Sequence, residues 1–237
     1  MIKAVIFDID NTMYDYDAAN CIAVRELEAW LSNRGLADAL ECRAAYTGAM
    51  EIIKKRTGID CAANHNRLLR FQCMLELLKV PSLSMALEMY HVYWDTVIGV
   101  MQPEPGLHAL LEALKEKGIR IGIGSNMTAY IQYKKLEKLE VLDRIDRIVV
   151  SEETGLEKPA PRFFEICVEK MGCAPDECIF IGDSVKNDVL GAITSRLHGV
   201  WYYPKEIKEM PEFPWIRSYL DCLKDGKIRF ADKLIIE

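Results

Sequence analysis

The chain has 237 residues, of which 50% are hydrophobic and 28% are charged, and its formal net charge is −6 at pH 7. This length allows one large domain, or a core with a smaller insert, and the composition is that of a folded globular protein. The acidic balance argues against nucleic acid as a partner, because duplex-binding proteins carry a basic surface that neutralises phosphates. It does not exclude a small phosphorylated metabolite, because a bound cation can reverse the local charge.

Export and membrane signals are not evident in the sequence. The apolar run before Asp8 is interrupted too early for a signal peptide, and no stretch reaches the roughly 18 apolar residues of a membrane helix. The eight cysteines form no C-x-x-C pair, which argues against zinc and dithiol motifs. We therefore expect buried thiols in a cytoplasmic protein with no membrane partner. The oligomeric state is left open.

The first predicted element is a buried strand over 3–9, an apolar run that ends in acids. The following block is rich in Ala, Leu, Glu, Met and Arg at helical spacing, and Gly35, Gly58 and Pro81 punctuate it. This pattern predicts four helices, near 18–33, 40–57, 64–79 and 83–97.

Beyond a linker at 99–106, helical and strand patterns alternate. We expect helices near 107–117, 128–139, 161–171 and 186–195, and strands at 119–124, 146–151, 178–182 and 199–202. Such alternation predicts an α/β fold with a parallel sheet covered on both faces. The lysines of the second of these helices are expected to form a solvated face: Lys134, Lys135 and Lys138. The tail, 204–237, is less regular, and its pattern indicates little about its structure.

Polar groups follow four of the predicted strands. These groups are Asp8, Asp10 and Thr12 after the first strand, Ser125 and Asn126 after the second, Lys158 beyond the third, and Asp183, Ser184, Asn187 and Asp188 after the fourth. In open α/β sheets, ligands bind beyond the carboxyl ends of the strands. We therefore expect these groups to converge on one edge of the sheet.

The chemistry of this set is consistent with binding of a phosphoryl group. Closely packed carboxylates repel one another and need a cation or a shared proton. Oxygen ligands suit Mg²⁺, which also binds substrate phosphates. A metal and a lysine can neutralise a phosphoryl group that would otherwise repel a carboxylate nucleophile, and phosphoryl transfer depends mainly on such positioning and charge stabilisation.

Taken in order, the four groups resemble the four motifs of the haloacid dehalogenase (HAD) superfamily of phosphotransferases. The resemblance covers about residues 1–203 and begins with Phe-Asp-Ile-Asp-Asn-Thr at 7–12. It implies a Rossmann-like catalytic core over 1–15 and 100–237. It also implies an α-helical (C1-type) cap over 16–99, inserted after the first strand.

The resemblance also implies roles for the reacting groups. Asp8 would attack phosphorus and become a phosphoaspartate. Asp10 would protonate the leaving oxygen and then deprotonate the hydrolytic water. Ser125 and Asn126 would bind the phosphoryl group, and Lys158 would steady the charge of the nucleophile and the phosphate.

The same resemblance implies a magnesium site. Asp183 would bind Mg²⁺ together with a side-chain oxygen of Asp8 and the backbone carbonyl of Asp10. Asp188 would lie close behind, as a further ligand or as the partner of Lys158. Two more polar residues are expected to support these groups: Thr12 and Asn187.

Asp10 narrows the reaction. Dehalogenases and phosphonate-cleaving members of the superfamily lack an acid at this position, so an acid argues for an oxygen leaving group and a phosphomonoester substrate. We therefore predict Mg²⁺-dependent hydrolysis of a small phosphate monoester, as a nucleotidase or a sugar-phosphate phosphatase. The alternatives are a phosphomutase of the same superfamily and a non-catalytic phosphate-binding module.

Two tyrosines follow the first motif closely. Tyr14 and Tyr16 lie four and six residues beyond Asp10, and an extended chain covers at most ~3.6 Å per residue, which limits them to about 15–22 Å from it. We expect Tyr14 or Tyr16 to line a substrate pocket between core and cap. Packing at the hinge is an equally weighted alternative.

Overall fold

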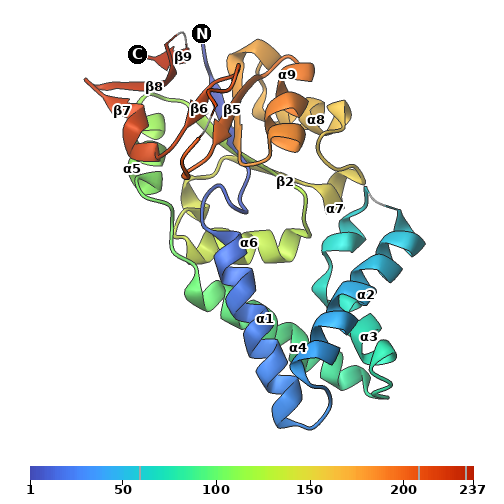
Figure 1. Ribbon diagram of the computed structural model, residues 1–237. Coiled ribbons are helices and arrows are strands. Elements are labelled where there is room, and N and C mark those ends of the chain that lie inside the picture. The colour runs from blue at the N-terminus through green and yellow to red at the C-terminus, as the bar shows by residue number, and fades with distance from the viewer. Residues whose placement is uncertain (59, 208, 233) are drawn as a thin grey trace. The chain divides into compact units, whose positions relative to one another are not determined.

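The computed structural model describes residues 1–58, 60–207, 209–232 and 234–237. The chain divides into two compact units (Figure 1). The sheet unit comprises Met1–Asp15 and Gln102–Glu237, and the helical unit comprises Tyr16–Met101. The helical unit is thus inserted in the sequence between the first and second strands of the sheet unit.

The described residues form one six-stranded parallel sheet in the sheet unit. In spatial order its strands are β3 (Arg147–Val150), β2 (Arg120–Ser125), β1 (Ala4–Phe7), β4 (Cys178–Gly182), β5 (His198–Tyr202) and β6 (Trp215–Ile216). All residues of β1 and β4 are buried, which explains why these strands read as continuous apolar runs rather than alternating ones. The α/β fold expected from the sequence is confirmed.

The strand order determines where a site can form. The chain runs from β1 to β2 and β3 on one side, and then returns to β4 and β5 on the other. Ala4 of β1 is paired with Arg120 of β2 and with Cys178 of β4. The carboxyl ends of β1, β2 and β4 are therefore neighbours at the switch in strand order, where open α/β sheets bind ligands.

Helices cover both faces of this sheet. Figure 1 shows α8 (Pro161–Met171) and α9 (Gly191–Thr194) on one side and α5 (Leu107–Glu116) on the other. The remaining helical segments of the sheet unit are α6 (Ala129–Lys138), η2 (Leu142–Arg144), α7 (Ser151–Thr154), η3 (Pro175–Glu177), η4 (Val185–Leu190) and η5 (Tyr219–Cys222). The helix predicted over 186–195 is a π-helical turn, η4, followed by the short α9.

Aromatic side chains pack α8 against the sheet. Phe163 and Phe164 are fully buried, and the Phe164 ring lies 5.1 Å from that of Phe180 in β4. Burial of one such ring contributes about 1.5–3 kcal/mol. The helix begins with Pro161 in its first turn and ends at Gly172 with φ +62°, so both boundaries follow from local sequence.

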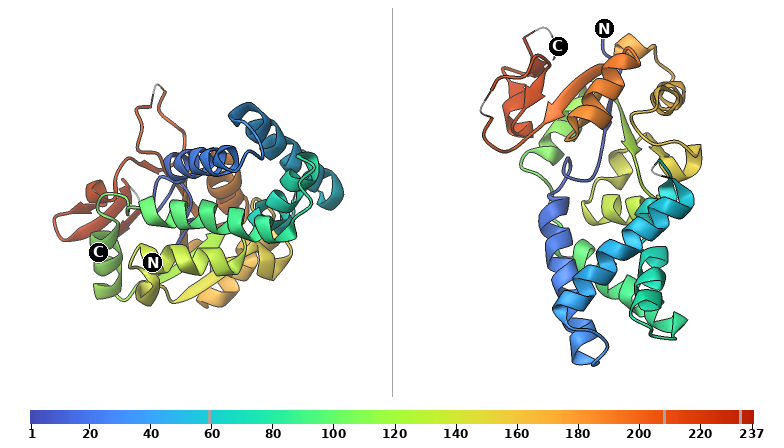
Figure 2. Two further views of the ribbon diagram at one scale, coloured as in Figure 1. Left: turned by 90° about the horizontal axis from the view of Figure 1, so that it is seen from below. Right: turned by 45° about the vertical axis from the view of Figure 1, so that its right-hand side comes forward.

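The tail, about which the sequence pattern indicated little, contains regular structure. Beyond β6, the strands β7 (Leu223–Lys224), β8 (Lys227–Ala231) and β9 (Leu234–Ile236) form a small antiparallel sheet that contacts α5 and β6 (Figure 2). Asp225 and Gly226 both have positive φ and connect β7 to β8. Asp-Gly is a strong signal for a two-residue hairpin, and it could have predicted this turn from the sequence.

The helical unit contains α1 (Tyr16–Asn33), α2 (Ala39–Thr57), η1 (Ala62–His65), α3 (Arg67–Leu77) and α4 (Leu83–Val100). The four predicted helices are confirmed, with shifted ends. Asp38 and Glu41 form a capping box at the start of α2, and the Asn66 side chain accepts hydrogen bonds from two backbone N–H groups of α3. These caps satisfy donors that helix starts leave unpaired.

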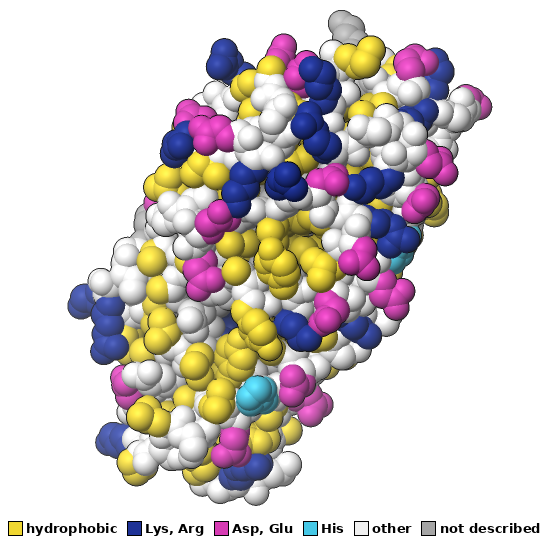
Figure 3. Space-filling view, turned by 180° about the vertical axis from the view of Figure 1, so that it is seen from behind, with side chains coloured by type: hydrophobic (Ala, Val, Ile, Leu, Met, Phe, Trp, Pro, Cys, Tyr) yellow, Lys and Arg dark blue, Asp and Glu magenta, His cyan; other side chains and the backbone are white. Residues whose placement is uncertain are grey.

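The surface shown in Figure 3 carries acidic and basic side chains interspersed with one another. This mixture fits the modest net charge of the chain, −6. Within the described ranges, every helix is too short or too polar to span a lipid bilayer.

Gly106, at the start of α5, provides a test of the packing of the tail. Its φ is +83°, and an added Cβ would lie 2.6 Å from the backbone nitrogen of Leu220 in η5. Gly118 is a matched control, because its φ is +69° with no atom within 4 Å of an added Cβ. We expect Gly106→Ala to lower the free energy of unfolding by at least ~1 kcal/mol more than Gly118→Ala. For a chain of this size, the difference in melting temperature is about 2–4 °C. Equal losses would show that the contact with η5 is not tight.

Candidate active site

The centre of the candidate site is a buried lysine between two buried carboxylates. Lys158 Nζ lies 2.8 Å from Asp8 Oδ1 and 2.7 Å from Asp188 Oδ1. The three residues are 5%, 6% and 1% exposed, respectively. Burial by itself would lower the pKa of Lys158, but the charges of Asp188 and Asp8 reverse this and raise it. The lysine is therefore charged, and it neutralises only one of its two carboxylate partners.

The backbone of Lys158 is held from the neighbouring strand. Asn126, directly after β2, accepts a hydrogen bond from the Lys158 N–H at 2.8 Å and donates one to the Lys158 carbonyl at 3.1 Å. This side chain positions the loop that carries the lysine. Its expected contact with phosphate stays a prediction.

The turn after β4 supplies Asp183 and Asp188. The Ser184 N–H donates to Asp188 Oδ2 at 2.9 Å, and the Asn187 N–H donates to Ser184 Oγ at 3.2 Å. At Gly182, an added Cβ would lie 2.4 Å from the Asp188 carboxyl group. Only glycine therefore leaves room for this carboxylate against the end of the strand.

Three carboxylates are arranged so that they could hold a metal ion. Asp8, Asp183 and Asp188 each offer an oxygen atom, and these atoms lie within 4.8 Å of one another. Burial, together with the charges of Asp8 and Asp188, raises the pKa of Asp183 to about 7. Burial also raises the pKa of Asp8 to about 6, with Asp188 and Asp10 adding to the effect and Lys158 opposing it. The acids hinder one another's ionisation, and a divalent cation with a preference for oxygen would relieve this.

Asp10 is paired with Lys135, a residue that was expected to face solvent. Lys135 Nζ donates to both Asp10 oxygens, at 2.6 and 2.8 Å, and the Tyr14 hydroxyl donates to Asp10 Oδ1 at 2.6 Å. Lys135 is fully buried, so the expectation of a solvated face was wrong for this residue. It shares the inward face of α6 with Ile131 and Leu136, and this apolar spacing was the signal that could have identified it.

Ser125, at the end of β2, is buried and accepts a hydrogen bond from Gln132 Nε2 at 2.6 Å. In this arrangement its own hydroxyl proton can be donated to a phosphoryl oxygen. Thr12 is also buried, and its hydroxyl has no hydrogen-bond partner among the residues that the structure describes. Its backbone carbonyl accepts from the Tyr219 hydroxyl at 2.8 Å, which ties the first motif to the tail.

The two tyrosines of the first motif belong to different units. Tyr14 is fully buried in the sheet unit beside Asp10. Tyr16 is the first residue of α1 in the helical unit. Its hydroxyl contacts the Tyr93 hydroxyl and accepts a hydrogen bond from the Arg67 guanidinium. The suggestion that either residue lines a substrate pocket stays a prediction.

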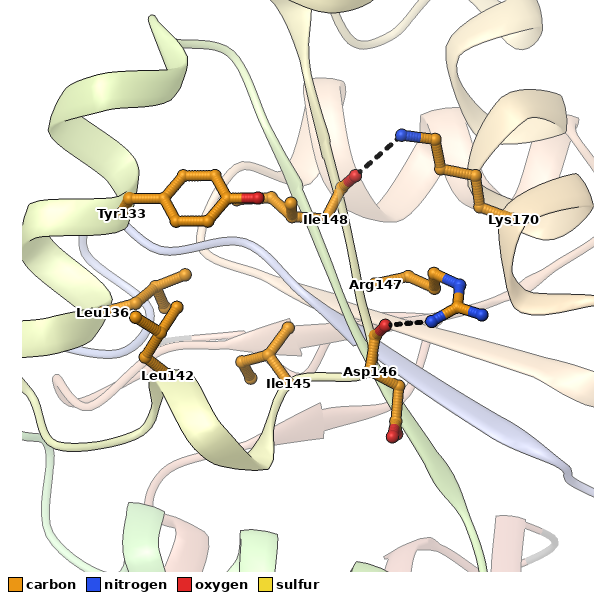
Figure 4. Close-up of a pocket in the computed structure, with 8 residues that line it drawn as sticks. All are labelled: Tyr133, Leu136, Leu142, Ile145, Asp146, Arg147, Ile148 and Lys170. Atoms are coloured by element: carbon orange, nitrogen blue, oxygen red, sulfur yellow. Dashed lines mark hydrogen bonds between the residues drawn. The ribbon is translucent and has the colours of Figure 1, made fainter.

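A separate pocket of the sheet unit lies between α6, η2, β3 and α8 (Figure 4). Apolar side chains such as Leu136 and Ile145 line it together with Arg147 and Lys170. None of its lining residues is one of the predicted site residues, and it lies near the amino end of β3, away from the carboxyl ends of the strands.

The fold and the carboxylate site are those of a known class of hydrolase. A family model of haloacid dehalogenase-like hydrolases matches residues 2–195. The chain belongs to this family, which confirms the resemblance inferred from the four motifs.

Its relatives over most of the chain are phosphatases. The chain is 33% identical to the ribulose-1,5-bisphosphate 5-phosphatase of Halopiger xanaduensis, over 90% of this chain and 89% of that protein. It is 28% identical to the glyceraldehyde 3-phosphate phosphatase of Methanopyrus kandleri, over 90% of this chain and 92% of that protein. It is therefore a HAD hydrolase of the phosphatase type.

Solved structures show the same fold. A HAD phosphatase from Thermococcus onnurineus gives a TM-score of 0.68 at 24% identity, covering 93% of this chain and 95% of that one. The HAD hydrolase YfnB of Bacillus subtilis, solved with bound magnesium, gives 0.69 at 22% identity, covering 93% and 96%.

The raised pKa values predict a pH-dependent effect of metal on stability. With pKa values near 6 and 7, folded Asp8 and Asp183 hold protons that the unfolded chain has already released. The contribution of these groups to stability therefore falls as pH rises from about 4 through 7. A cation that binds the ionised acids should reverse this loss, so Mg²⁺ should raise the melting temperature more at about pH 8 than at about pH 5.5, relative to EDTA. Asp183→Asn should diminish the difference, and an equal shift at both pH values would argue against a metal at these acids.

The contacts of Lys135 predict a loss of activity when its charge is removed. In Lys135→Met, Asp10 keeps its hydrogen bond from Tyr14 but loses those from the lysine, so its orientation for proton transfer is less restricted. We therefore expect kcat for a phosphate ester to fall by about 10²-fold with little change in KM. Lys134→Met is the matched control, because Lys134 pairs with Glu137 on the outward side of α6. A kcat within about twofold of wild type in Lys135→Met, measured at saturating substrate, would rule out this role.

Proposed function

We propose that this protein is a Mg²⁺-dependent phosphatase that hydrolyses small sugar-phosphate monoesters through a phosphoaspartate on Asp8. The observation that carries this proposal is the Lys158 ammonium 2.8 Å from the buried Asp8 carboxylate, with Asp183 and Asp188 beside it. The family membership and the phosphatase relatives support the same reaction.

In the first step, an Asp8 carboxylate oxygen attacks phosphorus and the bond to the ester oxygen breaks. Two anions must approach each other, and the Lys158 charge offsets their repulsion. The Ser125 hydroxyl donates to a phosphoryl oxygen, and Asn126 keeps Lys158 in place through its backbone. Asp10 gives its proton to the leaving oxygen, which departs as an alcohol.

In the second step, water attacks the phosphoaspartate and gives its proton to Asp10. Inorganic phosphate leaves, and both carboxyl groups return to their starting states. Two donors hold the Asp10 side chain: the Lys135 ammonium and the Tyr14 hydroxyl. They restrict its orientation, which matters because proton transfer needs hydrogen-bond geometry.

The donor set suits magnesium. Asp8 and Asp183 would hold the ion through side-chain oxygens and Asp10 through its backbone carbonyl, with Asp188 close by as a ligand or as the partner of Lys158. When bound, Mg²⁺ supplies positive charge that stabilises the phosphoryl oxygens. The magnesium in the fold relative YfnB supports this assignment. Thr12 and Asn187 support the loops that carry these ligands.

The names of the relatives favour sugar phosphates over nucleotides as substrates. Glyceraldehyde 3-phosphate and ribulose 1,5-bisphosphate are both small phosphorylated sugars. A phosphomutase would share the first step but pass the phosphoryl group to a second sugar hydroxyl. Product analysis separates the two reactions, because a phosphatase releases one inorganic phosphate for each alcohol formed.

Replacement of the nucleophile tests the proposal. Asp8→Asn keeps the shape of the side chain but removes its negative charge, so phosphate release with Mg²⁺ should fall by at least ~10³-fold. Asp143→Asn is the control, since Asp143 is an exposed acid of the sheet unit. Beryllium fluoride, which imitates a phosphoaspartate, should inhibit the wild type and not bind Asp8→Asn. Wild-type turnover by Asp8→Asn would disprove covalent catalysis at this residue.

A further inference from the structure

Asp183, one of the three acids that could hold a metal ion, lies just beyond the last residue of β4. That last residue, Gly182, is paired with Trp201 of β5. The Trp201 indole Nε1–H donates to the backbone carbonyl of Asp183 at 2.7 Å. The bond therefore extends the connection between β4 and β5 by one residue, to the residue that carries the carboxylate.

The indole ring that makes this bond is itself held by its neighbours. The ring of Trp201 stacks on that of Tyr203, with centres 4.5 Å apart and an angle of 20° between the planes. The Phe213 ring meets the Trp201 ring edge-on at 6.0 Å. The backbone N–H of Trp201 also donates to the Pro214 carbonyl at 2.9 Å. These contacts restrict the ring, so its N–H points in a fixed direction.

The other two acids of the cluster are attached through backbone donors. The Asp8 N–H donates to the Ile181 carbonyl in β4 at 2.9 Å, and Asp188 Oδ2 accepts a hydrogen bond from the Ser184 N–H. For Asp183, the donor belongs to a side chain from the next strand. A single substitution at Trp201 can therefore remove it and leave the attachments of Asp8 and Asp188 in place.

Aromatic packing alone does not require an indole at position 201. Phenylalanine offers a similar apolar ring for stacking but has no N–H donor. The donor matters because Mg²⁺ demands near-ideal octahedral geometry from its oxygen ligands. Residues that orient a ligand through hydrogen bonds, without contact with the metal, affect its binding by about 10–100-fold in metal sites generally.

We propose that Trp201 is a positioning residue of the metal site: its indole N–H fixes the backbone of Asp183 and thereby raises the affinity of the protein for Mg²⁺. This inference rests on the proposed function, in which Asp183 is a metal ligand. Trp201 acts through Asp183. Its removal should therefore weaken binding of the metal, whereas the chemical step should proceed once Mg²⁺ is bound.

Calorimetry of Mg²⁺ binding without any ester tests the inference. In Trp201→Phe the dissociation constant for Mg²⁺ should rise by at least ~5-fold. Trp215→Phe is the matched control, because it makes the same change in the next strand, β6, and it should keep the wild-type constant. The melting temperature in EDTA reports the loss of packing separately. Equal dissociation constants in wild type and Trp201→Phe overturn the inference, whatever the change in melting temperature.

Kinetics with p-nitrophenyl phosphate separates positioning of the metal from a general loss of activity. The Mg²⁺ concentration for half-maximal turnover should rise in Trp201→Phe, and kcat at saturating Mg²⁺ should stay within about threefold of wild type. A lower kcat with an unchanged Mg²⁺ requirement contradicts the inference. If the wild type neither binds Mg²⁺ nor hydrolyses the ester, the proposed function fails, and the inference fails with it.

The wild-type protein offers a test that does not depend on the folding of Trp201→Phe. The chain has four tryptophans, and each gives an indole N–H signal in the NMR spectrum. Single phenylalanine substitutions of Trp30, Trp94 and Trp215 assign three signals and leave that of Trp201. Addition of Mg²⁺ should shift the Trp201 signal most, because its acceptor carbonyl belongs to a metal ligand. A Trp201 signal that stays in place while calorimetry detects Mg²⁺ binding overturns the inference.

Discussion

The ion pairs of Lys158 with Asp8 and Asp188 are the constraint on which the rest of the site depends. One buried ammonium group holds two buried carboxylates from different parts of the chain: Asp8, directly after β1, and Asp188, in η4 after β4. Removal of the lysine would leave two uncompensated charges in a region without solvent, which is far more costly than loss of a surface pair. Asn126 holds the loop that carries Lys158, and Gly182 leaves room for the Asp188 carboxylate. Both features support these ion pairs.

The same constraint explains why the site is suited to a cation. Lys158 compensates one of the negative charges, and Asp183 brings a further carboxylate to the group. Burial raises the pKa values of Asp8 and Asp183, and the neighbouring carboxylates add to the effect. Such a cluster could hold a divalent cation, and under the proposed function that cation would present positive charge to the phosphoryl oxygens.

Buried cations occur in both units, but their partners differ. In the sheet unit, Lys135 and Lys158 each contact a carboxylate. In the helical unit, the hydrogen bonds of Arg67 and Arg70 to described residues go to hydroxyl and carbonyl oxygens. The first arrangement balances charge within the chain.

Much of the fold follows from the sequence by itself. Buried parallel strands are continuous apolar runs, amphipathic helices have their own period, and the polar groups of the four motifs follow strands. These features predicted the α/β core, the four inserted helices and the family. What the sequence did not give was the environment of individual charged side chains. Lys134 and Lys135 are neighbours in a lysine-rich helix. The apolar spacing of α6 indicates which of them faces inward, but only the packing of α6 decides that Lys135 meets Asp10 there.

The tail illustrates the same limit. The Asp-Gly turn at 225 and 226 is a local signal that could have been used, whereas the contact of Gly106 with Leu220 joins segments far apart in the chain. Sequence patterns report local backbone preference and average burial, because both depend on neighbours along the chain. Charge pairing depends on which elements pack together, and so only the tertiary structure decided which cations have a carboxylate partner and which do not.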